Sequence, residues 1–262
     1  MFSKLVLARR QFGVFVCVQT YLFLSSAKAG PMSENTIPPP PPEPPIPTGK
    51  VEGAWQFIEP ILAERHKPLL DDLRPGATDA ELDAAEQHMS VTLPPEFRAF
   101  YKGHDGQNGK APGFFFGAQF LSISEVVKKW DFWQQLLSED PGTYGKAGDS
   151  KSVPEGAIDT RYIFAKWIPF ADDRSGNHLG LDFGSGPRGV TGQCITFGRD
   201  QHTKFVVGKS FDAFIGWVQP RFWGGHSEFK WRTDIGDGVM TFDLVAPGAP
   251  DMIGLMTLLH EH

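Results

Sequence analysis

The chain has 262 residues, of which 40% are hydrophobic and 21% charged. This length is enough to bury the core of a domain, and 22 Phe and 7 Trp exclude a wholly disordered chain. Two cysteines, Cys17 and Cys194, are too few for a disulfide framework or a four-cysteine zinc site. No apolar run reaches the roughly 20 residues that a membrane-spanning helix needs, so we expect no membrane span.

The net charge of −6 is distributed unevenly along the chain. The first 31 residues carry only basic charges, at Lys4, Arg9, Arg10 and Lys28, which leaves −10 for the remainder. Nucleic-acid binding needs clustered Lys and Arg to contact phosphates, so we expect no nucleic-acid partner. An acidic body is instead suited to a basic protein partner.

Two N-terminal segments lie outside the expected fold. Residues 1–31 combine Arg9-Arg10, an apolar stretch from Phe12 to Leu24 and an Ala27-Lys28-Ala29 pattern, which is typical of a signal peptide. The alternative is a start codon assigned too early, since Met32 offers a second start. Residues 32–50 contain eight prolines and predict an extended polyproline linker.

Helices dominate the first half of the region from 51 to 225, where we expect the folded domain. Two capping boxes, Thr78 with Glu81 and Ser122 with Glu125, predict helix starts. Pro94-Pro95 separates the helix that begins at Thr78 from the next one. Trp130 and Trp133 lie one turn apart on the helix after Ser122, where core packing is the expected role. Residues 114–121 are expected to be a strand or a buried loop.

Strand patterns follow a loop expected at residues 138–157. Apolar, β-prone segments at 162–170, 179–181, 194–197 and 204–207 alternate with Gly- and Asp-rich turns, and Ser210 caps a short final helix. Helices first and strands later predict an α+β fold, with one domain built on a mostly antiparallel mixed sheet. Residues 226–262 form a C-terminal extension that could add a hairpin between 229–235 and 239–245.

Chemistry-bearing motifs are incomplete throughout the chain. Gly208-Lys209-Ser210 lacks the earlier glycine of a phosphate-binding loop. The loop from Asp172 to Asn177 has Arg174 where a calcium loop needs an acid. Cys194 falls inside a strand-like run and is expected to be a buried, inert thiol. We therefore expect no catalytic residue, no cofactor and no metal site.

Seven short stretches together resemble the SMI/KNR-type family of the SUKH superfamily. Their order and spacing carry the resemblance more than any one of them does. They are Gly76–Glu86, Leu93–Tyr101, Asp105–Gly109, Phe120–Val126, Trp167–Asp172, Asn177–Asp182 and Ser210–Ile215.

The resemblance implies an α+β domain that binds another protein and has no catalytic site. The family includes fungal cell-wall assembly regulators and bacterial immunity proteins. Our main interpretation is a bacterial immunity-type protein that neutralises a toxin domain, which we expect to be basic, in the cytoplasm. The alternative function is a regulatory scaffold of the cell-wall regulator type, and the alternative location is outside the cell if residues 1–31 are a true signal peptide. The oligomeric state stays open.

Polar loops beside aromatic residues are the expected partner surface, because loops carry much of the function of folded domains. We expect these loops to be exposed. The candidates are His104, Asp105, Gln107 and Asn108 after one helix, and Asp172, Asp173 and Asn177 in a later turn.

Overall fold

The computed structural model describes residues 50–146, 148, 150–223, 229–233, 240–244, 253–254 and 256. All of them belong to one of the two compact units of the chain, Pro44–His262. The signal-like segment and nearly all of the proline-rich linker lie outside the described residues, as does most of the C-terminal extension.

Helices precede most of the strands, as the sequence predicts. Four helices come first, α1 (Ala54–Arg65), α2 (Lys67–Asp72), α3 (Asp79–Met89) and α4 (Pro95–Gly103). They are followed by β1 (Gln119–Phe120), α5 (Ile123–Glu139), α6 (Pro141–Tyr144) and β2 (Lys151–Val153). The consecutive strands β3 (Trp167–Asp172), β4 (Asn177–Asp182), β5 (Gln193–Gly198) and β6 (Thr203–Gly208) then lead to α7 (Phe211–Trp223).

Six of these strands form one mixed sheet in the order β1-β3-β4-β5-β6-β2. Every pairing is antiparallel except that of β2 with β6. The α+β class and the mostly antiparallel sheet are thus confirmed. The expected hairpin is also present as β7 (Phe229–Thr233) paired with β8 (Met240–Leu244).

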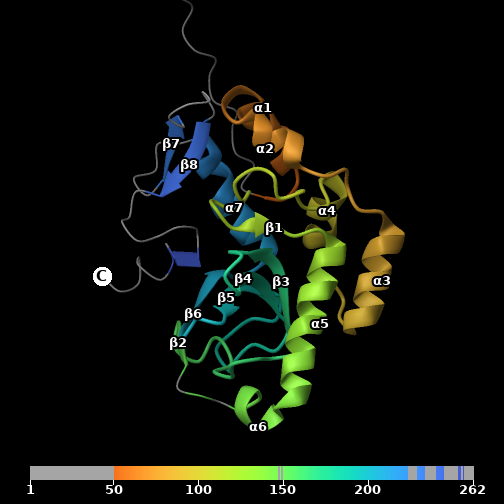
Figure 1. Ribbon diagram of the computed structural model, residues 1–262, viewed down its shortest axis with the longest axis vertical. Coiled ribbons are helices and arrows are strands. Elements are labelled where there is room, and N and C mark those ends of the chain that lie inside the picture. The colour runs from red at the N-terminus through yellow and green to blue at the C-terminus, as the bar shows by residue number, and fades with distance from the viewer. Residues whose placement is uncertain are drawn as a thin grey trace, which may run out of the picture. The chain divides into compact units, whose positions relative to one another are not determined.

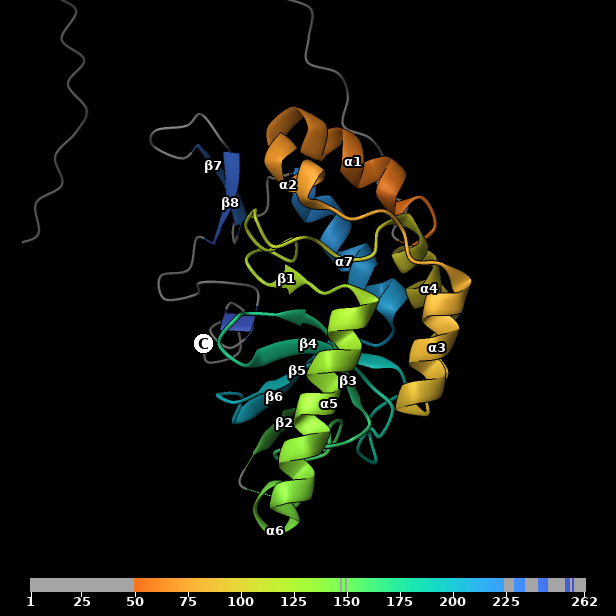
Figure 2. The same cartoon turned by 45° about the vertical axis from the view of Figure 1, so that its right-hand side comes forward.

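Both faces of the sheet are covered, which explains why β3, β4 and β5 are buried along their whole length. Successive side chains of a strand point to opposite faces. Accordingly Trp167 belongs to a cluster with Trp133 of α5, whereas Ile168 belongs to the larger, phenylalanine-rich cluster that includes α7. In Figures 1 and 2, α5 lies along the sheet and α3 lies beside α5.

Both predicted capping boxes are present. The Thr78 hydroxyl accepts from the Glu81 N–H at the start of α3, and Ser122 does the same for Glu125 at the start of α5. In each case the glutamate carboxylate accepts from the backbone N–H of the capping residue, at 2.8 Å. These boxes fix where α3 and α5 begin.

Two expected boundaries are wrong. The segment 138–157, predicted as a loop, contains α6 and β2. The Asp140 side chain caps α6 by accepting from Thr143 N–H at 2.9 Å, and β2 is held by its pairing with β6, a distant segment. The apolar run 162–170 becomes a strand only at Trp167. The segment 114–121 agrees with the expected strand or buried loop, because it is mostly buried and contains the short strand β1.

Candidate functional site

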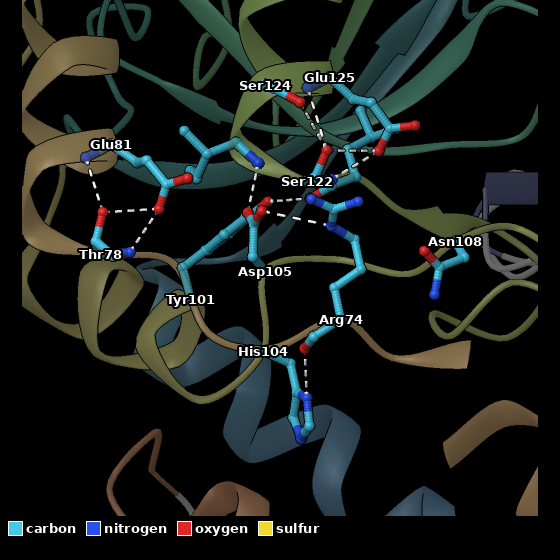
Figure 3. A network of polar contacts seen from close by, with 12 residues as sticks. Arg74, Thr78, Glu81, Tyr101, His104, Asp105, Asn108, Ser122, Ser124 and Glu125 are labelled. Carbon is cyan, nitrogen blue, oxygen red and sulfur yellow. Dashed lines mark hydrogen bonds and ion pairs between the residues drawn. The ribbon is translucent and has the colours of Figure 1, made fainter. Parts of the chain in front are cut away.

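Asp105 links the loop after α4 to the start of α5. Its Oδ1 accepts from the Ile123 N–H at 2.7 Å, and its Oδ2 lies 3.5 Å from Arg74 Nε (Figure 3). The following residue, Gly106, has φ +73°, and a Cβ there would lie 2.3 Å from Ser122 N. A side chain at position 106 would therefore push the loop away from the helix.

Gln107 and Asn108 bind inward to Asp72 at the end of α2. The Gln107 amide donates to the Asp72 carboxylate at 3.0 Å and accepts from the Phe114 and Phe120 N–H groups. The Asn108 amide donates to the Asp72 carbonyl at 2.9 Å. Both side chains therefore fasten their loop to the end of α2.

The Asp72 carboxylate also receives three successive backbone N–H groups at 3.0 to 3.1 Å, from Gly109, Lys110 and Ala111. Successive N–H groups that converge on one anion form a nest, here filled by the protein's own carboxylate. Sequence reasoning does not find Asp72. No local pattern marks it, because its partners lie 35 to 39 residues away.

His104 occupies the space between α1 and the segment before α3. Its Nδ1 lies 2.8 Å from the Arg74 carbonyl and its Nε2 lies 2.9 Å from Glu59 Oε1. The ring packs edge-on against Trp55, with centroids 4.5 Å apart. His104 therefore connects two helical segments, with both ring nitrogens engaged.

The second predicted group forms the tight turn between β3 and β4. Asp173 accepts from the Ser175 and Asn177 N–H groups and from the Asn177 amide, at 2.7 to 2.9 Å. Asn177 Oδ1 accepts from the Asp200 N–H at 2.8 Å, which joins this turn to the one between β5 and β6. Asp172 forms an ion pair with Lys129 of α5.

The exposure expected of these candidates is wrong for four of them. Asp105, Gln107, Asp172 and Asn177 are buried, and His104 and Asp173 are half-buried, while Asn108 is exposed. Turn residues look like surface in a sequence, but buried backbone N–H groups need acceptors, and these side chains supply or organise them. A role in partner binding stays a prediction for all seven residues.

Asp105 also lies on the wall of a groove between α3 and α5. The groove has a volume of about 460 Å³. Its floor is apolar, with Ala84 and Ala85 on α3 facing Ile123 and Val127 on α5. Its polar lining comes from Arg74, Glu81, His88, Asp105, Ser124 and Lys128.

The two ends of the groove differ in their chemistry. At the starts of the two helices, the Asp105 carboxylate lies beside the Arg74 guanidinium (Figure 3), and the Glu81 carboxylate adds a second negative charge to the lining. At the other end, His88 of α3 meets Asp131 of α5, with Nε2 and Oδ1 2.7 Å apart, and the His88 ring lies edge-on to Trp130.

Burial and charge perturb the titratable groups at the first end. Burial raises the pKa of Asp105 above its ordinary value; the Ile123 N–H and Arg74 oppose this shift and the Glu81 carboxylate adds to it. Burial, then the charges of Asp105 and Glu125, raise the pKa of the Tyr101 hydroxyl, which donates to the Leu121 carbonyl at 2.9 Å. Two carboxyl groups, those of Glu81 and Asp105, accompany one guanidinium in the lining at this end of the groove.

Sequence reasoning nominates only Asp105 among the residues that line this groove. The adjacent alanines at 84 and 85 are the one local signal, because they leave space on the face that α3 turns toward its neighbour. The alanines alone do not predict a groove, because its other wall comes from α5, about 40 residues later in the chain.

Metal binding, membrane insertion and thiol chemistry find no support among the described residues. Within this part of the chain, no group of three or more His, Cys, Asp and Glu side chains is arranged to hold a metal ion. None of the described helices is both long and apolar enough to cross a membrane. Cys194 is a buried free thiol, as expected, and burial raises its pKa well above the ordinary value.

Comparison with known proteins identifies relatives across most of the chain. It is 33% identical over 216 residues to the cell wall biosynthesis/cell cycle regulator smi1 of Schizosaccharomyces pombe, covering 79% of this chain and 40% of the relative. It is 32% identical to the glucan synthesis regulatory protein of Neurospora crassa, covering 64% of this chain and 37% of the relative. It is 31% identical to the cell wall assembly regulator SMI1 of Saccharomyces cerevisiae, covering 62% of this chain and 38% of the relative. The chain thus spans less than half the length of these relatives.

These relatives favour the alternative interpretation of the sequence over the main one. They are fungal and are named as regulators of cell-wall processes, so nothing among them supports a bacterial source or an immunity role. The model of the SMI1 / KNR4 family (SUKH-1) matches residues 76–217, a range that includes both capping boxes, most of the groove and strands β3 to β6. The chain therefore belongs to the SMI1/KNR4 family.

Proposed function

We propose that the chain is a non-catalytic scaffold that binds other proteins in the regulation of cell-wall assembly. The observation that carries this proposal is the 33% identity, over 79% of the chain, to a relative named as a cell-wall and cell-cycle regulator. The groove between α3 and α5 adds support, because an apolar floor with a polar rim is the usual form of a surface that receives a segment of another protein.

The polar side chains nominated from the sequence give no support to a catalytic role. Gln107, Asp172 and Asn177 hold turns and helix contacts together through short hydrogen bonds and ion pairs. A general base needs a carboxylate or imidazole within reach of a substrate proton, and these groups are already engaged within the fold. Cys194 is the cysteine among the described residues, and it is buried with a raised pKa. A nucleophilic cysteine needs an accessible thiol with a lowered pKa.

Affinity capture tests the scaffold proposal. The full chain serves as bait in extracts of a fungal host, at low and at high salt, with mass spectrometry of the retained proteins. Recovery of several proteins of wall assembly or its signalling is the expected result. A single toxin-like partner would instead support the immunity interpretation, and turnover in a hydrolase screen that disappears on Asp172→Asn would contradict a non-catalytic role.

Location is a separate proposal. We place the protein in the cytoplasm, with export as the alternative if residues 1–31 function as a signal peptide. Fractionation of cells that express the full chain with a C-terminal tag tests this. Cleavage after the Ala27-Lys28-Ala29 pattern, with the tagged product outside the cell, would overturn the cytoplasmic assignment.

A further inference from the structure

We propose that the groove between α3 and α5 binds a basic–aliphatic segment of a partner protein, with an aliphatic side chain on the alanine floor and a Lys or Arg at the Asp105 end. This inference rests on the protein-binding function proposed above and names the kind of partner and the place where it binds.

The floor of the groove fits one aliphatic side chain. Ala84 is exposed and Ala85 is buried, so α3 offers short side chains where it faces Ile123 and Val127 of α5. The volume of about 460 Å³ is well above that of a single Leu or Met side chain and leaves room for a stretch of backbone. An apolar side chain seated there removes apolar surface from water on both partners, which favours binding.

The charges at the first end favour a basic group. Two carboxylates, those of Glu81 and Asp105, line this end of the groove together with the single guanidinium of Arg74. The Asp105 side chain is only 10% exposed, and its Oδ2 lies 3.5 Å from Arg74 Nε, which is longer than a hydrogen bond of good geometry. A Lys or Arg from a partner would supply the missing positive charge and a hydrogen-bond donor to a largely desolvated acceptor.

The other end of the groove sets the direction of the bound segment. His88 lines it and contacts Asp131 and the Trp130 ring, and Lys128, which also lines the groove, lies three residues before Asp131 on α5. A second basic group in the partner would be repelled by the Lys128 ammonium. The segment therefore places its basic residue near Asp105, and a neutral or acidic residue near Lys128.

Nuclear magnetic resonance of the full chain tests this proposal, with the methyl groups of Ile123, Val127 and Ala85 labelled. The probes are Gly-Ser decapeptides with one Lys and one Leu zero to three residues apart. Matched peptides carry Glu in place of Lys, or Ser in place of Leu. We expect saturable shifts of these methyl signals with the Lys–Leu peptides, and binding at least about threefold weaker for either matched peptide. Equal or tighter binding of the Glu peptides, or no shifts with any Lys–Leu peptide, would overturn the proposal.

Variants separate the floor from the charged end. Ala84→Phe fills the groove and should weaken binding of the Lys–Leu peptide at least about tenfold, whereas Gln87→Phe adds the same side chain at an exposed position of α3 outside the groove and should leave it unchanged. Glu81→Gln keeps a residue that completes the capping box but removes a charge, so it should weaken binding about two- to fivefold. Lys128→Glu should tighten it by a similar factor.

The same variants distinguish this proposal from the proposed function. If Ala84→Phe still captures the wall-assembly proteins that the wild type captures, the scaffold function stands and the groove is not its docking site. If the wild type captures none but the peptides bind in the groove, the docking chemistry stands and the wall-assembly role fails. Loss of capture for Ala84→Phe, with normal capture by Gln87→Phe, supports both.

Discussion

Asp72 and Asp105 are both buried carboxylates at the ends of helical segments, and their surroundings differ in one respect. Asp72 receives hydrogen bonds from the Gln107 amide and from three backbone N–H groups. Asp105 receives one from the Ile123 N–H, and its second oxygen lies 3.5 Å from Arg74 Nε, beyond the usual length of a hydrogen bond. The Asp72 carboxylate is saturated, because the fold supplies all its hydrogen-bond donors, whereas Oδ2 of Asp105 can accept a further hydrogen bond.

This difference separates a structural site from a binding site. A buried polar group with all its partners in place stabilises the fold and has no capacity left for a ligand. A buried carboxylate with an unfilled position is desolvated without full compensation, and a partner that fills the position gains from it. The nest at Asp72 and the groove at Asp105 therefore serve different purposes, although both are built on the loop that follows α4.

The strongest test removes the saturated carboxylate. Asp72→Ala leaves three backbone N–H groups and the Gln107 amide without their acceptor, so we expect it to lower the free energy of unfolding by about 3–5 kcal/mol. Urea denaturation followed by circular dichroism measures this. The matched control is Asp71→Ala, which removes an exposed carboxylate paired only with Lys67, and should cost less than about 0.5 kcal/mol. Equal losses for the two variants would show that the nest contributes little.

The next largest effect comes from His178, a buried imidazole whose Nδ1 lies 3.3 Å from the Ala171 carbonyl. Burial lowers its pKa from 6.5 to about 4, with the Asp172 carboxylate opposing the shift and the Lys129 ammonium adding to it. The unfolded chain takes up a proton below about pH 6.5 that the folded state refuses until about pH 4. Stability should therefore fall by up to about 3 kcal/mol as the pH drops through this range.

His178→Gln tests this pH dependence, because glutamine keeps a donor for the Ala171 carbonyl without titrating. Urea midpoints measured between pH 7 and pH 4 should fall less steeply for the variant than for the wild type. If both proteins lose stability in parallel down to pH 4.5, the acid sensitivity comes from other groups.

Lys204 extends the comparison to a buried cation. It is 1% exposed, its Nζ has a hydrogen bond of 3.4 Å to the Gln201 carbonyl, and it lies 5.5 Å from the centroid of the Trp167 ring. Burial lowers its pKa to about 8, with Asp159 opposing the shift. The penalty on the charged form is full below about pH 8 and disappears as the pH rises toward the ordinary lysine value, because the unfolded chain then also loses its proton.

Lys204→Met should therefore stabilise the protein at pH 7, by about 1–3 kcal/mol, because the thioether fills similar space without a charge. The gain should shrink in denaturation experiments above pH 9. A variant that is less stable than the wild type at pH 7 would show that the interaction with Trp167 outweighs the cost of desolvation.

The contrast between local and distant chemistry also explains what the sequence predicts. Both capping boxes can be read from the sequence because each consists of residues three apart, whose partners are fixed by the helix itself. The buried strands can be read because each contains apolar, β-prone residues bounded by Gly- and Asp-rich turns. The strand β2 escapes prediction because its pairing with β6 joins residues about 50 positions apart. The same holds for Asp72, whose donors all come from a later loop.

The groove shows this limit most clearly. Asp105 is nominated by its place in a polar loop, yet the loop buries it against α5. The sequence marks Glu81 only as part of a capping box, and nothing in it separates Arg74 and Lys128 from other surface charges. The packing of α3 beside α5, with alanines between them, brings these residues into one site. No local sequence pattern predicts which helices pack together.

The smallest predicted effect on stability belongs to Asp105→Asn. The asparagine carbonyl still accepts from the Ile123 N–H, and the ion pair with the partly exposed Arg74 is long, so removing the charge should cost little. Because the pKa of Asp105 is raised in the folded state, its ionised form is penalised at pH 7, and asparagine removes that penalty. We expect the variant to be as stable as the wild type at pH 7 or more stable by up to about 1 kcal/mol.

The difference in stability between Asp105→Asn and the wild type should depend on pH. In the wild type, protonation of Asp105 removes the cost of burying its negative charge. The stability advantage of the variant should therefore shrink as the pH falls below the raised pKa. Urea denaturation at several pH values between 7 and 4 measures this. A loss of about 2 kcal/mol or more at pH 7, as large as for a saturated carboxylate, would mean that Asp105 is satisfied within the fold after all. Unchanged stability together with loss of Lys–Leu peptide binding would mean that this carboxylate is held in place to meet a partner.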